Sequence, residues 1–347
     1  MITRSLTNGS KLVDWTEEVN ELDNQYGLIN SMGLFSENGI SQLSVVFDKN
    51  IVEHTLMSQS DRQGNRPTSI QGRKLETFSL ATSYFNEVGQ VTANDVQGIR
   101  DANTPDGARN IASAVTEKMI DMRVKMDQTK EYMKIQAIKG VTKDADGNIL
   151  ANMFDEFSIS QKEVDFDLGT ETTDVDAKIA EVKRYIAKNA KAGGAIGKIE
   201  ILCDPEFFDK LVSHPSMRTA YQYYQNSTVQ LLRDDLSTYE TWGVTDTFEH
   251  RGVRFTAYDA TFTLPSGSTE DAFDASTGFS IVKGMRGLYR GYNSPANTLS
   301  GANQVGSPLF AYETRDPSDK FINVEIEAAP LHVLMKPQVS VKVISST

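Results

Sequence analysis

Residues 108–139 contain neither proline nor glycine, and this uninterrupted stretch constrains the fold more than any other feature of the chain. Its apolar side chains recur at spacings of three, four and seven residues, which places them on one face of an α-helix. They are Ile111, Val115, Met119, Met122, Met126, Met133 and Ala137. We predict a helix over 106–139 that ends at Gly140 and has the first six of these residues as its core. Its stretch over 108–139 would span roughly 48 Å at about 1.5 Å per residue. A coiled coil is the rival interpretation, but the stripe is short and rich in methionine.

Two strand-like segments flank a polar loop before this helix. In the first, Leu43, Val45 and Phe47 alternate with other residues, and a second alternating segment runs from Leu75 to Val88. The loop at 58–74 carries four basic side chains against one acidic side chain. These are Arg62, Arg66, Arg73 and Lys74. The pattern predicts a long hairpin with a basic tip, which must pack on something because an isolated hairpin is marginally stable.

Residues 1–41 are polar and acidic, with short apolar islands that are too small to bury themselves. The spacing of Leu12, Trp15, Val19 and Leu22 predicts a short helix over 11–22. We interpret the whole segment as an arm whose apolar residues gain burial on a neighbouring copy. The arm residues expected to make contacts are Trp15, Leu28, Ile29, Leu34 and Phe35.

A second domain of mixed type is predicted after the long helix. A helix over 177–192 is followed by a buried strand at 199–203 and by a helix that begins at Pro205 after a capping Asp204. An Asp-Gly turn at 146–147 joins two short strands, and further strands are expected at 253–257, 279–282, 321–328, 331–335 and 339–344. Helices and strands in this order predict an α+β fold.

The charge balance bears on the partners of the chain. The 47 acidic and 35 basic residues leave a formal net charge of −12 over 347 residues. Phosphate backbones are bound by clustered Lys and Arg, so specific binding of nucleic acid is not expected. The lone cysteine, Cys203, forms no intramolecular disulfide. Neither a signal peptide nor a run of 18 apolar residues is present, and we predict a soluble protein made in a cytoplasm.

No reaction centre is evident. The four histidines, His54, His214, His250 and His332, have no partners at metal-ligand spacing. Asp144, Asp146 and Asn148 suggest a calcium loop, but the required glutamate is missing and a hairpin turn is the better account. Cys203 is expected to be a buried, inert thiol. We therefore predict no catalytic, metal or cofactor site, and no enzyme.

The order of these parts resembles the tailed-phage major capsid proteins of the lambda head protein type, the major capsid protein E family. The most specific segments lie near the C-terminus: 252–259 (Gly-Val-Arg-Phe-Thr-Ala-Tyr-Asp), 312–317 (Tyr-Glu-Thr-Arg-Asp-Pro), 325–331 (Glu-Ile-Glu-Ala-Ala-Pro-Leu) and Met335-Lys336-Pro337. Supporting segments are 199–208 (Ile-Glu-Ile-Leu-Cys-Asp-Pro-Glu-Phe-Phe), with Leu211 and His214-Pro215 after it, and the helix end Ala137-Ile138-Lys139-Gly140. The resemblance covers essentially the whole chain.

The resemblance implies a Hong Kong 97-type capsid fold of class α+β. Its parts would be an N-terminal arm at 1–41, an extended loop (a β-hairpin) at 42–92, a peripheral domain at 93–171 with the spine helix at 106–139, an axial domain at 172–310, and a return to the peripheral domain with closing strands at 311–347. Five or six axial domains would surround each capsomer centre.

The same resemblance implies a structural head protein that self-assembles into hexamers and pentamers of an icosahedral shell. The shell would enclose the dsDNA genome without binding it specifically, and would form in the host cytoplasm as a procapsid that expands. Implied partners are other copies of the chain, a scaffolding protein and a portal, with a decoration protein as an optional addition. No residues match a crosslinking site. We predict that Arg62, Arg66, Arg73 and Lys74 contact an adjacent subunit, where a positive tip meets an acidic chain.

Two alternatives stay open at this point. An encapsulin-like nanocompartment uses the same fold to enclose a cellular enzyme. A soluble hydrolase with an unrecognised site would instead form a small oligomer.

Overall fold

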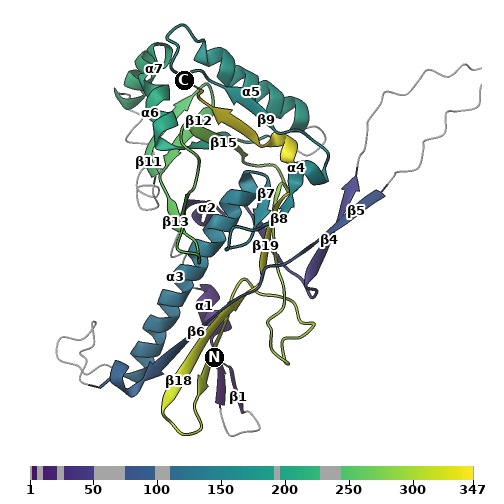
Figure 1. The fold of residues 1–347 in the computed structure, drawn as a ribbon, viewed down its shortest axis with the longest axis vertical. Coiled ribbons are helices and arrows are strands. Elements are labelled where there is room, and N and C mark those ends of the chain that lie inside the picture. The colour runs from purple at the N-terminus through teal and green to yellow at the C-terminus, as the bar shows by residue number, and fades with distance from the viewer. Residues whose placement is uncertain are drawn as a thin grey trace, which may run out of the picture.

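The computed structural model describes residues 2–5, 11–21, 27–50, 75–97, 110–190, 196–226 and 244–346. The long helix α3 (Ile111–Ile138) joins a lower lobe, which holds the N-terminus, to an upper lobe, which holds the C-terminus (Figure 1). A hairpin projects sideways from the region between the lobes. Helices and sheets are mixed, so the fold class is α+β as predicted.

The helix α3 confirms the long helix expected from the sequence, with a later start. Asn110 is extended and its side chain accepts the backbone N–H of Ser113 at 2.7 Å, so the helix begins at Ile111 and not at 106. Residues 101–109 lie outside the described residues. The helix ends just before Gly140, as predicted.

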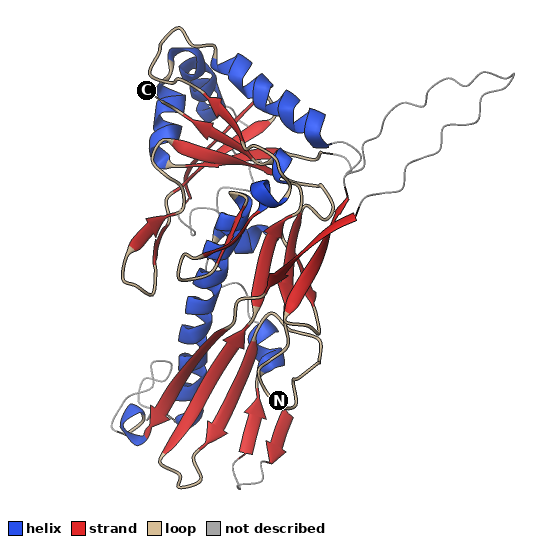
Figure 2. Ribbon diagram, turned by 45° about the vertical axis from the view of Figure 1, so that its right-hand side comes forward, coloured by secondary structure: helices blue, strands red, loops and turns tan. Residues whose placement is uncertain are grey.

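The lower lobe is a five-stranded antiparallel sheet in the order β1-β2-β17-β18-β6. Its strands are β1 (Ile2–Ser5), β2 (Lys11–Asp14), β17 (Phe310–Arg315), β18 (Phe321–Ala328) and β6 (Phe85–Thr92). The first half of α3 packs on one face of this sheet, where Val115, Met119, Met122 and Met126 meet Val324 and Ile326. Figure 2 shows the helix lying along the sheet.

The upper lobe contains a mixed six-stranded sheet in the order β11-β12-β10-β15-β20-β9. The strands are β11 (Val244–His250), β12 (Val253–Tyr258), β10 (Ile199–Cys203), β15 (Thr277–Val282), β20 (Val341–Ile344) and β9 (Lys162–Asp165). The helices of this lobe are α5 (Val175–Ala190), α6 (Pro205–Ser213) and α7 (Pro215–Asn226). The Asp204 side chain caps α6 by accepting the Glu206 N–H, and Pro205 occupies its first turn, as the sequence predicts.

Smaller elements complete the two lobes and their junction. They are the sheet β19-β16-β3 (Pro330–Leu334, Tyr289–Asn293 and Ser36–Gly39), the hairpins β7–β8 (Val141–Lys143 and Ile149–Asn152) and β13–β14 (Thr261–Thr263 and Thr269–Asp271), the helices α1 (Thr16–Glu21), α2 (Leu28–Met32) and α4 (Met153–Glu156), and the 3₁₀ turns η1 (Ala93–Asp95) and η3 (Pro337–Val339). The β7–β8 hairpin confirms the predicted Asp-Gly turn, in which the Asp144 side chain accepts the N–H groups of Asp146 and Asn148.

The projecting hairpin pairs β4 (Ser44–Asn50) with β5 (Leu75–Ala81) over seven residue pairs. Phe47 stacks on Phe78 with ring centroids 5.2 Å apart, and Phe47 and Leu80 pack on Leu331 and Val333 of β19. The hairpin is therefore anchored at its base to its own chain.

Three strands, β6, β9 and β20, pair with sheets on the other side of the domain boundaries expected from the sequence. The second hairpin strand ends at Ala81, and β6 at 85–92 pairs with β18 instead, because its alternate side chains such as Val91 face α3. The strands β9 and β20 pair with each other, and β20 also pairs with β15, so both belong to the sheet of the upper lobe.

The helix predicted over 11–22 is wrong in its first part. Residues 11–14 form β2, which pairs with β17, and among the described residues of this range the helix covers Thr16–Glu21. The Asp14 side chain accepts the Thr16 N–H at 3.0 Å and the Trp15 N–H reaches the Ala311 carbonyl at 2.9 Å, so the strand and the helix meet at a tight corner.

Candidate assembly surfaces and the junction of the lobes

The described part of the chain offers no reaction centre. It holds no group of three or more His, Cys, Asp or Glu side chains that could bind a metal ion. Burial raises the pKa of the Cys203 thiol, so the side chain is an inert core residue, as predicted. His214 contacts Ser216 and the Thr170 carbonyl, and His250 contacts Asp176; His54 lies outside the described residues. Within the described residues, no helix is both long and apolar enough to span a membrane.

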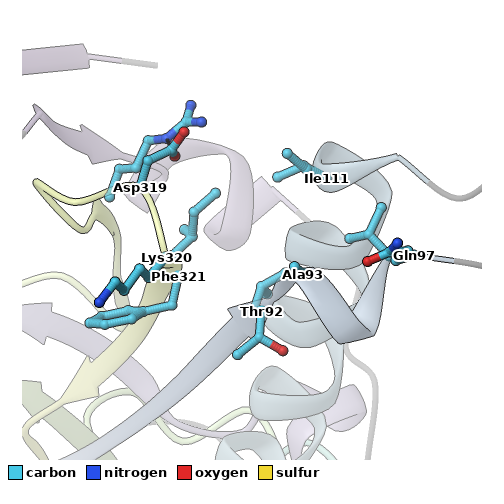
Figure 3. Close-up of a pocket in the computed structure, with 11 residues that line it drawn as sticks. Thr92, Ala93, Gln97, Ile111, Asp319, Lys320 and Phe321 are labelled. Carbon is cyan, nitrogen blue, oxygen red and sulfur yellow. Dashed lines mark hydrogen bonds and ion pairs between the residues drawn. The ribbon is translucent and has the colours of Figure 1, made fainter.

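A groove of about 290 Å³ opens at the outer end of the lower lobe (Figure 3). Ala93 and Gln97 follow β6, Ile111 begins α3, Lys320 precedes β18, and Phe321 begins β18. On its rim, Arg315 donates to Asp319 at 2.6 Å. The lining is largely apolar, and two of its charged side chains, Arg315 and Asp319, pair with each other instead of converging on a substrate. The groove is thus a surface feature without catalytic geometry.

Ile111 corrects the predicted core of the spine helix. The other five predicted residues, Val115, Met119, Met122, Met126 and Met133, are buried, but Ile111 is 47% exposed. It occupies the first turn of α3 on the border of the groove, where the sheet no longer covers the helix (Figure 3).

The arm residues also differ from the prediction. Leu28, Ile29 and Phe35 are buried in the core of their own chain, Leu34 packs against that core, and Trp15 packs beside the lower sheet. The expectation that these side chains need a neighbouring copy for burial is therefore wrong. The reason is that α2 and β3 dock on the second half of α3 and on β16.

Glu131 holds the arm to the long helix. Its carboxylate accepts the N–H groups of Ile29 at 2.7 Å and Asn30 at 2.8 Å, and the Tyr258 hydroxyl of β12 at 3.1 Å. The side chain is fully buried, and burial raises its pKa to about 7. One carboxyl group thus ties together the arm, the long helix and the upper sheet.

A second carboxylate fixes β3 to the same junction. Glu37 accepts from Lys134 at 3.0 Å, from His332 at 3.2 Å and from Asn293 at 3.1 Å. Burial alone would raise the pKa of Glu37, but His332 and Lys134 outweigh it and hold the pKa well below the usual range. Burial lowers the pKa of His332, which is 1% exposed.

Sequence reasoning missed these junction residues. Glu131 and Lys134 stand three residues apart on a helix, as many solvent-exposed pairs do, and their partners lie about 100 residues earlier. Charged side chains recur along α3 from Glu117 to Lys134, as they would on a lone surface helix, so the local sequence does not distinguish Glu131 and Lys134.

The predicted contact residues of the hairpin tip, Arg62, Arg66, Arg73 and Lys74, lie outside the described residues. The described parts of the hairpin end at Asn50 and Leu75, which pair with each other.

The arm, the projecting hairpin, the long helix and the two sheet lobes together define a Hong Kong 97-type capsid fold, as the solved structures show. A prophage protein of Escherichia coli CFT073 assigned as a capsid protein matches with a TM-score of 0.58 at 14% identity, covering 96% of this chain and 99% of the other. The mature capsid of bacteriophage PhiM1 matches at 0.51 and 12% identity, with 90% and 85% covered.

The chain belongs to the phage major capsid protein E family, whose model matches residues 11–345. It is 28% identical to the major capsid protein of Salmonella phage Felix O1 over 99% of this chain and 98% of that one. It is 27% identical to the major capsid protein of Pseudomonas phage KPP10, with 97% of each covered.

Membership of this family makes the chain a structural capsid protein of a phage virion and not an enzyme. Its function is carried out by many copies in a multimeric shell. The hydrolase and nanocompartment alternatives are set aside.

Proposed function

We propose that the chain assembles into hexamers and pentamers of an icosahedral shell that encloses dsDNA, by way of a procapsid that expands. A scaffolding protein, a portal and a decoration protein are the proposed partners, and the host cytoplasm is the proposed place of assembly. The domain limits proposed for this role are those expected from the sequence, with β9 and β20 assigned to the axial domain and β6 to the peripheral domain.

The observation that carries the proposal is the projecting hairpin. Its base is fixed to the body by Phe47 and Leu80, while the strands lead away from both lobes (Figure 1). Beyond this base, the outer strand residues Asp48 and Thr77 are exposed. The placement of the hairpin is understandable if it lies across another copy.

Charge supports the same role for the tip. Residues 58–74 carry four basic side chains and one acidic side chain in a chain of net charge −12. Positive charge at the tip favours docking on an acidic neighbour, and it steers the encounter. The overall negative charge also disfavours tight adhesion to enclosed DNA, whose phosphates would be repelled.

The test is to replace Arg62, Arg66, Arg73 and Lys74 by Glu together. We expect the variant to fold as the wild type does and to form no shells. The matched control carries Arg→Lys at positions 62, 66 and 73 and Lys→Arg at position 74. It keeps the positive charge and should still assemble. Thermal unfolding reports the fold, and electron microscopy counts the shells. Normal shells from the Glu variant would overturn the proposed contact.

A separate scaffold is tested by expressing the chain alone. Uniform shells under these conditions would show that no separate scaffold is needed, whereas irregular or incomplete particles are the expected result.

A further inference from the structure

Two segments of the chain that carry no charged residue lie together on the surface. Residues 38–46 and 294–306 contain no Asp, Glu, Lys or Arg, although 24% of the whole chain is charged. Segments of this combined length would carry about five charges at the average composition. We refer to the surface that they form as the neutral patch.

Hydrogen bonds hold the two segments side by side. The Ile40 N–H donates to the Asn293 carbonyl at 2.9 Å, and the Gly306 N–H donates to the Ile40 carbonyl at 2.9 Å. The Ser294 hydroxyl donates to the Gln42 carbonyl at 2.8 Å. The patch is therefore a fixed part of the surface, built from the end of β3 and the loop between β16 and β17.

Apolar side chains project from this patch. Leu299 is fully exposed, and Leu43, Val46 and Val305 are each more than 60% exposed. A recess of about 170 Å³ lies beside the same loop, lined by Thr298, Val305 and Tyr312 among others, with Asp14 as its charged lining residue. Large side chains exposed together without charge among them are unusual on a monomer and mark contact surfaces.

The chemistry of the neutral patch indicates which kind of partner binds it. The centres of protein interfaces are depleted of charged residues, which this patch lacks altogether. Copies of a chain with net charge −12 repel one another, so a contact between them is favoured where neither side brings a charge. DNA would require basic residues, which the patch does not have. A second copy of this chain meets all of these conditions.

We propose that the neutral patch is a contact between subunits in the shell, with Leu299 and Val305 buried against a second copy. This inference rests on the proposed assembly, because the second copy is a neighbour in the shell. Burial of the exposed apolar side chains stabilises the contact, and the absence of charge removes the desolvation cost that a charged interface would carry.

The first test compares two double variants of the full-length chain. Leu299→Asp with Val305→Asp places two negative charges on the patch, whereas Leu299→Asn with Val305→Thr changes polarity without charge. Both sites are exposed, so the melting temperature of the unassembled chain should stay close to that of the wild type in each case. We expect the yield of shells to fall about tenfold or more for the Asp variant and to fall far less for the neutral variant.

The second test is hydrogen exchange in the wild-type chain, compared between unassembled protein and shells that were assembled with the scaffolding protein and then freed of every other protein. Peptides covering 38–46 and 297–306 should exchange more slowly in the shell. Unchanged exchange in such shells would overturn the contact between copies and would leave the patch free for another protein.

The outcomes separate this inference from the proposed function. Wild-type shells together with a normal yield from the Asp variant would contradict only the contact at the neutral patch. A wild-type chain that forms no shell even when its scaffolding protein is supplied would contradict the proposed function and this inference together.

Discussion

The Glu131 carboxylate in the middle of the molecule accepts the backbone N–H of Ile29 at 2.7 Å, although the two residues lie 102 positions apart. Its other oxygen accepts the Asn30 N–H. The backbone N–H groups at the start of α2, which have no partner within the helix, therefore bond to a buried carboxyl group instead of to water. This contact turns a segment that the sequence suggests is a free arm into a part of the core.

The pH dependence of stability provides a direct measure of this carboxyl group. We expect the advantage of the wild-type chain over a Glu131→Gln variant to grow as the pH falls from about 7 to 4.5. Because burial raises the folded-state pKa to about 7, above the ordinary 4.5, the folded chain holds a proton that the unfolded chain has lost in this interval. The contribution is fully present below pH 4.5 and is lost as the pH rises through 7.

At about 1.4 kcal/mol per pH unit, the change is about 3 kcal/mol at most. Urea unfolding of both unassembled chains at pH 5 and pH 7.5 measures it. His332 has the opposite effect on the pH dependence. Burial lowers its pKa, so the folded chain resists protonation of His332 and loses stability as the pH falls. Both chains retain His332, so its effect cancels in the comparison. A difference between the chains that does not vary with pH would contradict the assignment.

Gly27 is expected to be irreplaceable at the same junction. Its φ is +101°, and a Cβ there would lie 2.4 Å from the Glu131 carboxyl carbon. Gly27→Ala should therefore cost more than about 2 kcal/mol, since it combines an unfavourable backbone conformation with a clash at a buried carboxyl group. Gly33 has a φ of +58° but open space around it, so Gly33→Ala should cost only about 1 kcal/mol. Equal losses in chemical unfolding would argue against the clash.

The packing of α3 on the lower sheet predicts unequal effects along one helix face. Met119 is 4% exposed, and Met119→Ala should lower the free energy of unfolding by about 2–5 kcal/mol. Ile111→Ala removes a side chain that is nearly half exposed, so the loss should stay below about 1 kcal/mol. Thermal and urea unfolding of the two variants side by side provide the comparison. A larger loss at Ile111 would mean that the first turn of α3 is buried in solution.

Local signals in the sequence were sufficient for several elements. The strand at 321–328 has the observed bounds of β18, because its apolar residues alternate and one face is buried. Asp204 and Pro205 mark the start of α6 through capping chemistry that involves only adjacent residues. Gly140 marks the end of α3 for the same kind of reason.

Other features depend on partners that are distant in the sequence. Residues 11–14 have helical spacing, but they form a strand because they pair with β17, about 300 residues later in the chain. The alternation at 85–92 suits a hairpin and a sheet equally, and only the pairing with β18 decides between them. The polar residues in the second half of α3 have the pattern of a solvent-exposed face, but in the structure α2 and β3 cover them.

The candidate surfaces also combine features that are visible in the sequence with features that depend on distant contacts. The charge-free segments at 38–46 and 294–306 are visible in the sequence, but their side-by-side position arises from the hydrogen bonds of Ile40 with Asn293 and Gly306. The basic residues of the hairpin tip were recognised from composition alone, and their contacts stay a prediction.

The central claim is that many copies of this chain close into an icosahedral shell. Cryo-electron microscopy of the particles purified from their source tests it most directly. The predicted result is a closed particle with five-fold vertices, in which each subunit shows α3 as a rod and the β4–β5 hairpin lies across a neighbouring subunit. Small oligomers of a few chains, or a shell in which the hairpin touches only its own subunit, would contradict it.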